Sequence, residues 1–201
     1  MRKITINLAA VAAFCIVVAS PALVSSSCAT PKTEQEDTTI IREDSGITAL
    51  KYSSPEVPAS IEFCGKTIDL SRFDRHERMD RELLAFTYMH STSLQMLKKA
   101  NRYFPIVEPI LKENGIPYDF KYLMVIESNM NPTARSSAGA AGLWQFMQGT
   151  GRDYGLEVNN NVDERYHIEK ATRAACRYLK DAYAKYKDWV AVAASYNAGQ
   201  A

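Results

Sequence analysis

Apolar side chains recur every three or four positions between residues 75 and 101, which is the spacing of one face of an α-helix. We therefore predict one long amphipathic helix over this range. His90 falls on the same stripe, so we interpret it as a packed histidine and not as a metal ligand. The apolar members of the stripe are Met79, Leu83, Phe86, Leu94 and Leu97.

Proline and glycine mark the ends of a second predicted helix. Pro105 opens the segment "PIVEPILKENG", Gly115 closes it and Pro117 follows. Proline suits the first turn because its missing N–H would have no partner there, and glycine suits the position just past the last turn. We therefore predict a separate helix between Pro105 and Gly115.

Two further segments are apolar on every side and are therefore predicted to be buried helices. "FKYLMVIES" can be capped by Asp119, and "WVAVAASY" can be capped by Asp188. Each ends at polar residues: Glu127 in the first segment and Tyr196-Asn197 in the second. A buried helix that ends at a carboxylate is poorly placed for stability unless the carboxylate has a task.

The remaining elements complete a mostly α-helical fold. "GLWQFMQGTG" (142–151) is predicted to be a short amphipathic helix, and "SIEFCGKTIDLS" to contain one or two short strands around Gly65. A longer helix is predicted to present one face made of Ile168, Ala171, Ala175, Tyr178, Leu179, Ala182 and Tyr186.

The N-terminus has the layout of an export signal. Arg2 and Lys3 precede an apolar stretch from Leu8 to Ala19, which is too short for an ordinary membrane span, and small residues lead to Cys28. We predict a signal peptide over 1–27 with lipidation of Cys28, although "VSSSC" departs from the usual lipoprotein pattern. Cleavage without lipid and a buried N-terminal helix are the alternatives.

Residues 28–58 are rich in Thr, Ser, Pro and charge and are predicted to be a tether. Such a flexible stretch would span about 30 Å on average. An irregular arm packed on the domain is the alternative. Residues 59–100 then form an N-terminal extension that contains the long helix.

Composition narrows the classes of partner. The chain has 201 residues with 23 acidic and 24 basic side chains, and no basic run indicates nucleic-acid binding. The scattered histidines and the lack of a CxxC or HExxH motif indicate no metal site. Cys176 lies on the apolar side of the segment "ATRAACRYL", so we predict that it is a core thiol and forms no disulfide with Cys64.

Glu127 is the first candidate for chemistry. A carboxylate at a helix C-terminus faces the negative end of the helix dipole, and shelter from solvent disfavours its charge further. Both effects favour the protonated form, which a general acid needs in order to protonate a glycosidic oxygen. The alternative is a solvent-facing side chain that bonds its neighbours.

Two other stretches supply groups that suit a sugar site. "AGAAGLWQFM" (138–147) combines glycines, which let backbone approach a ligand, with the amide of Gln145. "SYNAG" (195–199) adds a phenol and a second amide. Each stretch alone is more often a packed turn or a helix end.

Taken in order, "ES" (127–128), "GLWQ" (142–145) and "YNAG" (196–199) resemble the SLT domain of lytic murein transglycosylases, which share a lysozyme-like fold with goose-type lysozymes. "FMQGTGRDYGL" and "VDERYHIEKAT" are similar to the membrane-bound type D branch. The resemblance covers about residues 100 to 201, so the transglycosylase SLT domain is expected over 101–201.

The resemblance implies that Glu127 is the sole catalytic acid and base, with no carboxylate nucleophile and no cofactor. Asp163 and Glu164 are accordingly interpreted as helix-entry and salt-bridge groups. Ser128 is implied to order the catalytic loop. The other implied binding residues, of which Met147 fits least well, are Gly142, Leu143, Gln145, Met147, Tyr196 and Asn197.

The expected reaction is cleavage of the β-1,4 bond between N-acetylmuramic acid and N-acetylglucosamine in peptidoglycan glycan strands, with formation of a 1,6-anhydro ring. A goose-type muramidase and a non-catalytic wall-binding protein are the alternatives. The expected location is the periplasm, on a membrane through Cys28.

Two features depart from the family. Ser195 replaces the usual Ala, and the sequence stops at Ala201, where relatives continue with further helix and wall-binding LysM repeats. We therefore expect a C-terminally truncated cleft.

Overall fold

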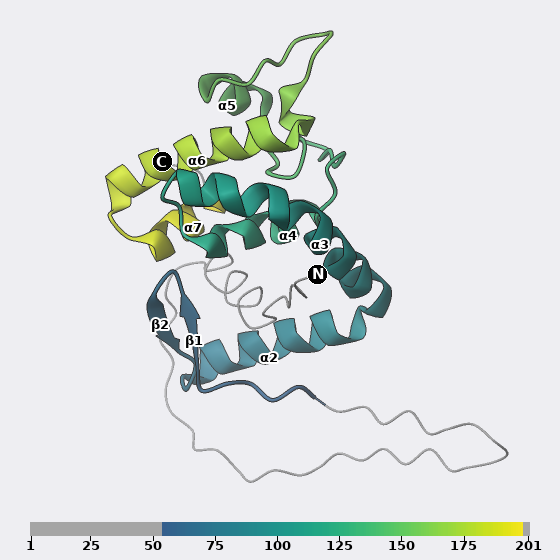
Figure 1. Ribbon diagram of the computed structural model, residues 1–201. Helices are drawn as coiled ribbons and strands as arrows, with labels where there is room; N and C mark the ends of the chain where they lie inside the picture. The colour runs from purple at the N-terminus through teal and green to yellow at the C-terminus, as the bar shows by residue number, and fades with distance from the viewer. Residues whose placement is uncertain (1–53, 199–201) are drawn as a thin grey trace, which may run out of the picture.

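The computed structural model describes residues 54–198. A two-stranded hairpin precedes a set of helices (Figure 1), which confirms the mostly α-helical prediction. The signal peptide, Cys28 and most of the tether lie outside the described residues. The elements are β1 (Ser60–Phe63), β2 (Lys66–Asp69), α2 (Phe73–Tyr88), α3 (His90–Glu113), the 3₁₀ helix η1 (Tyr118–Tyr122), α4 (Leu123–Ser128), α5 (Gln148–Asp153), the 3₁₀ helix η2 (Glu164–Tyr166), α6 (Ile168–Tyr186) and α7 (Trp189–Ala198).

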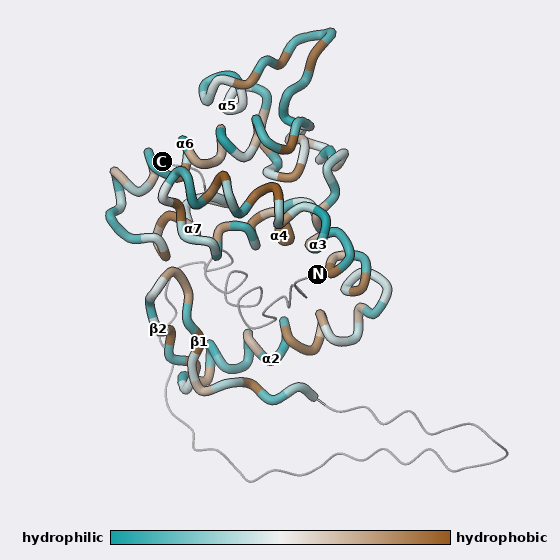
Figure 2. Tube along the Cα trace, in the orientation of Figure 1, coloured by the Kyte–Doolittle hydropathy of each residue, from teal (hydrophilic) through white to brown (hydrophobic). Residues whose placement is uncertain are grey.

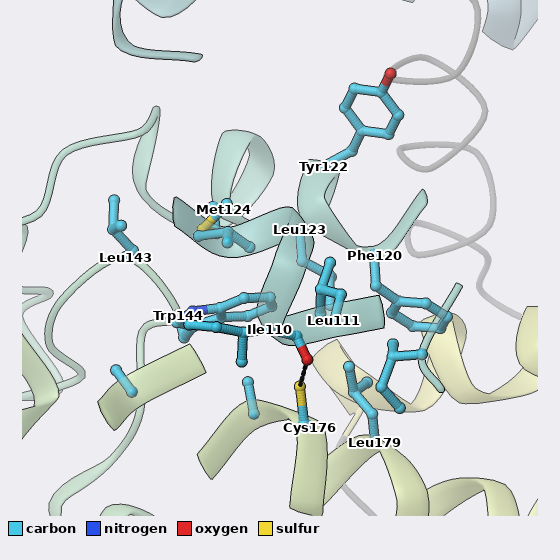
Figure 3. Close-up of a cluster of buried hydrophobic side chains, with 14 of the residues drawn as sticks. Ile110, Leu111, Phe120, Tyr122, Leu123, Met124, Leu143, Trp144, Cys176 and Leu179 are labelled. Atoms are coloured by element: carbon cyan, nitrogen blue, oxygen red, sulfur yellow. Dashed lines mark hydrogen bonds between the residues drawn. The ribbon is translucent and has the colours of Figure 1, made fainter. Parts of the chain in front are cut away.

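The main core lies where α3, α4, α6 and α7 meet (Figures 1 and 2). Trp144 is fully buried there, and Figure 3 shows its ring beside the side chains of α3 and above Cys176 of α6. The Cys176 thiol lies 4.0 Å from the carbonyl oxygen of Ile110. Cys176 is therefore a core residue, as predicted, and Cys64 and Cys176 are both free thiols.

The predicted helix over 75–101 is wrong in one respect, because it is broken at Met89. The backbone of Met89 leaves the helical region (φ −78°, ψ 49°), and α3 starts again at His90. The Ser93 hydroxyl donates to the carbonyl oxygen of Phe86 and so satisfies one of the open carbonyls at the end of α2. The break rotates the apolar stripe, and His90 is exposed with its ring edge-on to Tyr88. The prediction of a packed His90 is therefore wrong.

The second predicted helix does not begin at Pro105. Pro105 and Pro109 both lie inside α3, on its exposed side. Each proline removes a backbone hydrogen bond and normally breaks a helix at a cost of about 3 kcal/mol or more. The opposite side of α3 buries Phe104, Val107, Ile110 and Leu111, and this burial offsets the loss. The helix ends before Gly115, as predicted. Because α3 runs through residue 100, the domain boundary expected there falls inside a helix.

The hairpin predicted around Gly65 is confirmed. β1 and β2 pair antiparallel, and Cys64 and Gly65 both take positive φ at the turn, as a type I′ hairpin turn requires. The backbone N–H of Cys64 donates to Asp119 at 2.7 Å. Asp119 therefore holds the hairpin and does not cap the following helix α4, which has no side-chain cap.

The hairpin also reaches α7. Lys66 pairs with Asp188 at 2.7 Å, while Asp188 accepts from the N–H of Val190 and so begins α7 as predicted. Phe63 is fully buried against Phe120. The hairpin is thus part of the main core.

A second, smaller cluster joins the hairpin to α2. Val57 packs against it, and Ser54 donates to Asp80 at 3.1 Å. The last residues of the predicted tether are therefore packed on the domain. The buried members of the cluster are Ile61, Leu70, Met79 and Leu83.

Within residues 54–198, no helix has both the length and the hydropathy needed to cross a membrane.

Candidate active site

Glu127 is the second-to-last residue of α4, a short helix whose first three residues are buried. Its Oε1 atom is buried and has no hydrogen-bond partner among the residues that the structure describes. Burial raises the pKa of this carboxyl from 4.5 to about 7. The direction is the one expected from the sequence, and burial is its cause. A carboxyl in this state is protonated for a large fraction of the time near neutral pH.

The backbone explains why the helix stops immediately after this carboxyl. Asn129 and Met130 both adopt left-handed conformations, with φ values of 49° and 57°. Their N–H groups donate to the carbonyl oxygens of Val125 and Met124, which closes the end of α4. Met130 is fully buried, so its side chain anchors this strained turn in the core. The sequence "ESNMNP" therefore fixes Glu127 at a helix end.

Ser128 connects α4 to the loop at 142–146, which lies beside it. Its buried hydroxyl lies 2.9 Å from the carbonyl oxygen of Met124 and 3.1 Å from that of Leu143. The hydroxyl proton can be donated to either oxygen. This contact holds the backbone of the 142–146 segment beside the end of α4.

The segment 142–147 is not the predicted helix. Gly142 and Gln145 have φ values of 78° and 49°, which a helix excludes, and Ala141 forms isolated bridges with Arg135 and Phe146. Helix α5 begins only at Gln148. The amphipathic pattern misled the prediction because Trp144 is buried from a turn, where its indole N–H donates to Thr172 at 3.0 Å.

The predicted binding residues of this loop differ in their burial and in their contacts with the rest of the protein. A Cβ on Gly142 would lie 2.0 Å from the carbonyl oxygen of Arg165, so Gly142 is needed for close packing within the protein. Leu143 is only 2% exposed and lies in the core. The Gln145 amide donates to the carbonyl oxygens of Gly142 and Ala134. Met147 is exposed.

Tyr196 of α7 is near enough to Glu127 to respond to its charge. Its hydroxyl donates to the carbonyl oxygen of Trp144 at 2.9 Å, and its ring packs edge-on against Tyr178. Burial, and next the charge of Glu127, raise the pKa of Tyr196 well above its usual value. The structure thus brings together Glu127, Ser128, Tyr196 and the loop. The side chain of Asn197 lies outside the described residues.

The two other acidic residues singled out in the sequence are ion-paired, as predicted. Asp163 accepts from the guanidinium of Arg165, which holds the pKa of Asp163 below its usual value, and it caps η2. Glu164 pairs with Lys170, and its second oxygen accepts from the N–H of Glu157. Sequence reasoning missed the partner Arg165, since "VDER" alone gives no sign that this arginine is buried.

No cluster of three or more metal-ligating side chains occurs within residues 54–198. A surface hollow of about 520 Å³ lies on the exposed side of α3 and contains none of the predicted site residues. Its lining residues are Pro105, Glu108, Pro109, Lys112, Tyr118 and Lys121.

Comparison with known families agrees with this arrangement. Residues 105–201 match the family described as "Transglycosylase SLT domain", which covers α4, the loop and α7. Over these residues the chain is similar to transglycosylase SLT domains.

Individual relatives are more specific. The chain is 31% identical over 125 residues to "Membrane-bound lytic murein transglycosylase D" of Escherichia coli strain K12, a match that covers 62% of this chain and 27% of the relative. It is 34% identical over 90 residues to "Peptidoglycan transglycosylase gp16" of Escherichia phage T7, covering 43% and 7%. A third relative, "Putative tributyltin chloride resistance protein" of Alteromonas sp. strain M-1, is 23% identical over 114 residues, covering 56% and 55%. The chain thus spans about a quarter of the length of the first relative.

Proposed function

We propose that this protein is a lytic transglycosylase that cleaves the β-1,4 bond between N-acetylmuramic acid and N-acetylglucosamine in peptidoglycan. The observation that carries the proposal is the state of Glu127: a buried carboxyl oxygen at a helix end, with no hydrogen-bond partner within residues 54–198 and a pKa of about 7. The family match and the names of two relatives, which specify murein or peptidoglycan, support the substrate class.

In this mechanism Glu127 acts twice. The protonated carboxyl first donates its proton to the glycosidic oxygen, so that N-acetylglucosamine leaves with a free 4-hydroxyl. The carboxylate then accepts the proton of the C6 hydroxyl of the same N-acetylmuramic acid while that oxygen bonds to C1. The product is a 1,6-anhydro sugar, and Glu127 ends the cycle protonated. A pKa close to ambient pH suits both transfers.

The cation-like anomeric carbon needs stabilisation between these steps. Asp163 and Glu164 are both engaged in ion pairs, so neither is proposed as a nucleophile. The oxygen of the substrate's own N-acetyl group is proposed for this role, as in substrate-assisted glycosidases. Ser128 and Tyr196 are proposed to fix the surroundings of Glu127, and Gln145 and Asn197 to contact the sugar. Gly142 and Leu143 are packed within the protein and Met147 is exposed, and all three are proposed to shape the sugar-binding surface beside Glu127.

Replacement of Glu127 by glutamine tests the proposal. The amide keeps the size of the side chain but neither donates a carboxylic proton nor takes one back, so we expect a rate loss of at least about 10²–10⁴-fold on purified cell wall. Glu169→Gln, an exposed position on α6, is the matched control and should keep wild-type activity. Equal loss in both variants, or none in Glu127→Gln, would remove Glu127 from the mechanism.

Mass spectrometry of the products separates the alternatives. A transglycosylase gives anhydromuropeptides, which are one water lighter than the reducing ends that a muramidase leaves. Dominant reducing ends would favour a goose-type muramidase. Glycan binding without turnover, in wild type and variant alike, would favour a wall-binding protein.

We further propose a periplasmic membrane location through a lipid on Cys28. The motif around Cys28 supports it, together with the words "membrane-bound" in the name of one relative. Cys28→Ser should release the protein into the soluble fraction. A wild-type protein that is already soluble and carries no lipid label would contradict the anchor.

A further inference from the structure

Arg165 is a buried arginine that sequence reasoning did not single out. It lies in η2, and only 3% of it is exposed. Its Nε and Nη2 atoms donate to the two carboxylate oxygens of Asp163 at 2.9 and 2.7 Å. Its Nη1 atom donates to the carbonyl oxygens of Gly139 and Phe146 at 2.8 and 3.0 Å. One side chain thus satisfies four acceptors, two of them backbone oxygens at the two ends of one loop.

The same residue contacts the middle of that loop through its backbone. Its carbonyl oxygen occupies the space that a Cβ on Gly142 would fill, at 2.0 Å. Arg165 therefore defines the loop 139–146 at its start, its middle and its end. The ordered pair with Asp163 holds the guanidinium in place for these contacts.

The loop carries two carbonyl groups that bind the neighbours of Glu127. The carbonyl oxygen of Leu143 lies 3.1 Å from the Ser128 hydroxyl, on the helix that bears Glu127. The carbonyl oxygen of Trp144 accepts from Tyr196, whose pKa responds to the charge of Glu127. A shift of the loop would therefore move groups on two sides of the carboxyl.

We propose that Arg165 is a positioning residue of the active site: it holds the loop 139–146 so that Ser128 and Tyr196 enclose Glu127. This rests on the proposed function of Glu127. Lysine cannot replace it, because a single ammonium group lacks the planar fork that reaches Asp163 and two backbone oxygens together.

The effect on Glu127 is one of enclosure and not of direct charge. Arg165 is neutralised by Asp163, while Arg135 also lies near Asp163. The titratable group that faces Glu127 from α7 is Tyr196, and the raised pKa of Glu127 has burial as its cause. A looser loop admits water to the carboxyl, which lowers its pKa toward the ordinary value.

Arg165→Lys tests the proposal with two measurements on the full chain. We expect kcat on cell-wall glycan to fall about 10–100-fold with KM changed less than about threefold, since misplacement costs rate. Carbon-13 NMR titration of the Glu127 carboxyl should show its pKa lowered by about one unit. Arg173→Lys is the matched control, because Arg173, on α6, forms an exposed pair with Glu113 of α3. It should change neither quantity.

Asp163→Asn is the second variant. It keeps Arg165 but removes the negative charge that holds its guanidinium. It should shift kcat and the pKa of Glu127 in the same directions by smaller amounts. A folded Arg165→Lys protein with unchanged kcat and unchanged pKa would overturn the proposal, as would an unchanged pKa in folded Asp163→Asn if Arg165→Lys does not fold. If the wild-type protein has no activity but both variants still lower the pKa of Glu127, the positioning role is supported and the proposed function is contradicted.

Discussion

The hydroxyl oxygen of Tyr196 lies 2.9 Å from the carbonyl oxygen of Trp144, to which it donates a hydrogen bond. These residues are 52 positions apart and belong to two separate sequence motifs. Their contact ties α7 to the loop at 142–146, and Ser128 ties the same loop to α4. The three motifs are therefore one hydrogen-bonded unit around Glu127.

Tyr196→Phe removes only the hydroxyl from this unit. We expect a loss of about 0.5–1.5 kcal/mol in the free energy of unfolding, since one neutral hydrogen bond is lost. We also expect kcat to fall more than KM changes, because the loop beside Glu127 is released. Thermal melting and steady-state kinetics check both points, with Tyr186→Phe on α6 as the control. Unchanged kcat would mean that the hydroxyl has only a structural role.

The pH dependence of activity follows from the pKa of Glu127. As a general acid the carboxyl must be protonated, so activity on cell wall should fall as pH rises through about 7. The measurement is kcat/KM between pH 5 and 9. Any residual activity of Glu127→Gln should lack this alkaline limb. An alkaline limb that survives in the variant would assign it to another group.

Stability should depend on pH in the same interval. The native carboxyl keeps its proton up to about pH 7, whereas the unfolded one releases it near 4.5. Stability contributed by this group is therefore complete below 4.5 and is lost as pH rises through 7. We therefore expect the free energy of unfolding of Glu127→Gln, relative to that of wild type, to increase between pH 4 and pH 8. The increase should be on the order of 2 kcal/mol, after solvent screening of the exposed part of the side chain. Melting temperatures across this interval measure the difference.

Gly142→Ala should damage the fold far more than a glycine change of the same kind elsewhere. The added Cβ would meet the Arg165 carbonyl oxygen at 2.0 Å, and Gly142 has a φ of 78°. We expect a loss of about 4 kcal/mol or more, the range of severe single substitutions. Gly149→Ala is the matched control, since its Cβ meets nothing within 4 Å and it lies in α5. Similar melting temperatures for the two variants would contradict the packing role of Gly142.

Phe63→Ala tests whether the hairpin belongs to the same cooperative unit as the helices of the main core. Phe63 is fully buried and packs against Phe120, so we expect a loss of about 3–5 kcal/mol. Tryptophan fluorescence should show the whole transition moved to lower denaturant. A separate early transition that leaves the tryptophan signal unchanged would make the hairpin an independent appendage.

Local sequence patterns predicted the elements whose partners lie nearby in the chain. The hairpin turn at Gly65, the face of α6 and the cap at Asp188 all depend on short-range spacing. The buried surroundings of Glu127 were also predictable, because an apolar run with no polar face has to be buried. Its raised pKa follows from that burial.

Long-range contacts decided the features that the sequence did not predict. Pro105 and Pro109 remain inside α3 because the opposite side of the helix is buried in the core. The loop at 142–147 is no helix, because Arg165 and Thr172, about 20 to 30 residues away, fix its backbone and the Trp144 indole. Such contacts leave no periodic signal at the position that they determine.

The pairing of Lys66 with Asp188 has a consequence for how the domain folds. The contact closes a loop of 122 residues, so it forms only after nearly all of the described chain is available. The helices α3 and α6 can pair before it, and the hairpin then docks on η1 and the start of α7 as a late step. We expect refolding to show a slow phase. This phase should become slower when the contact between Lys66 and Asp188 is weakened.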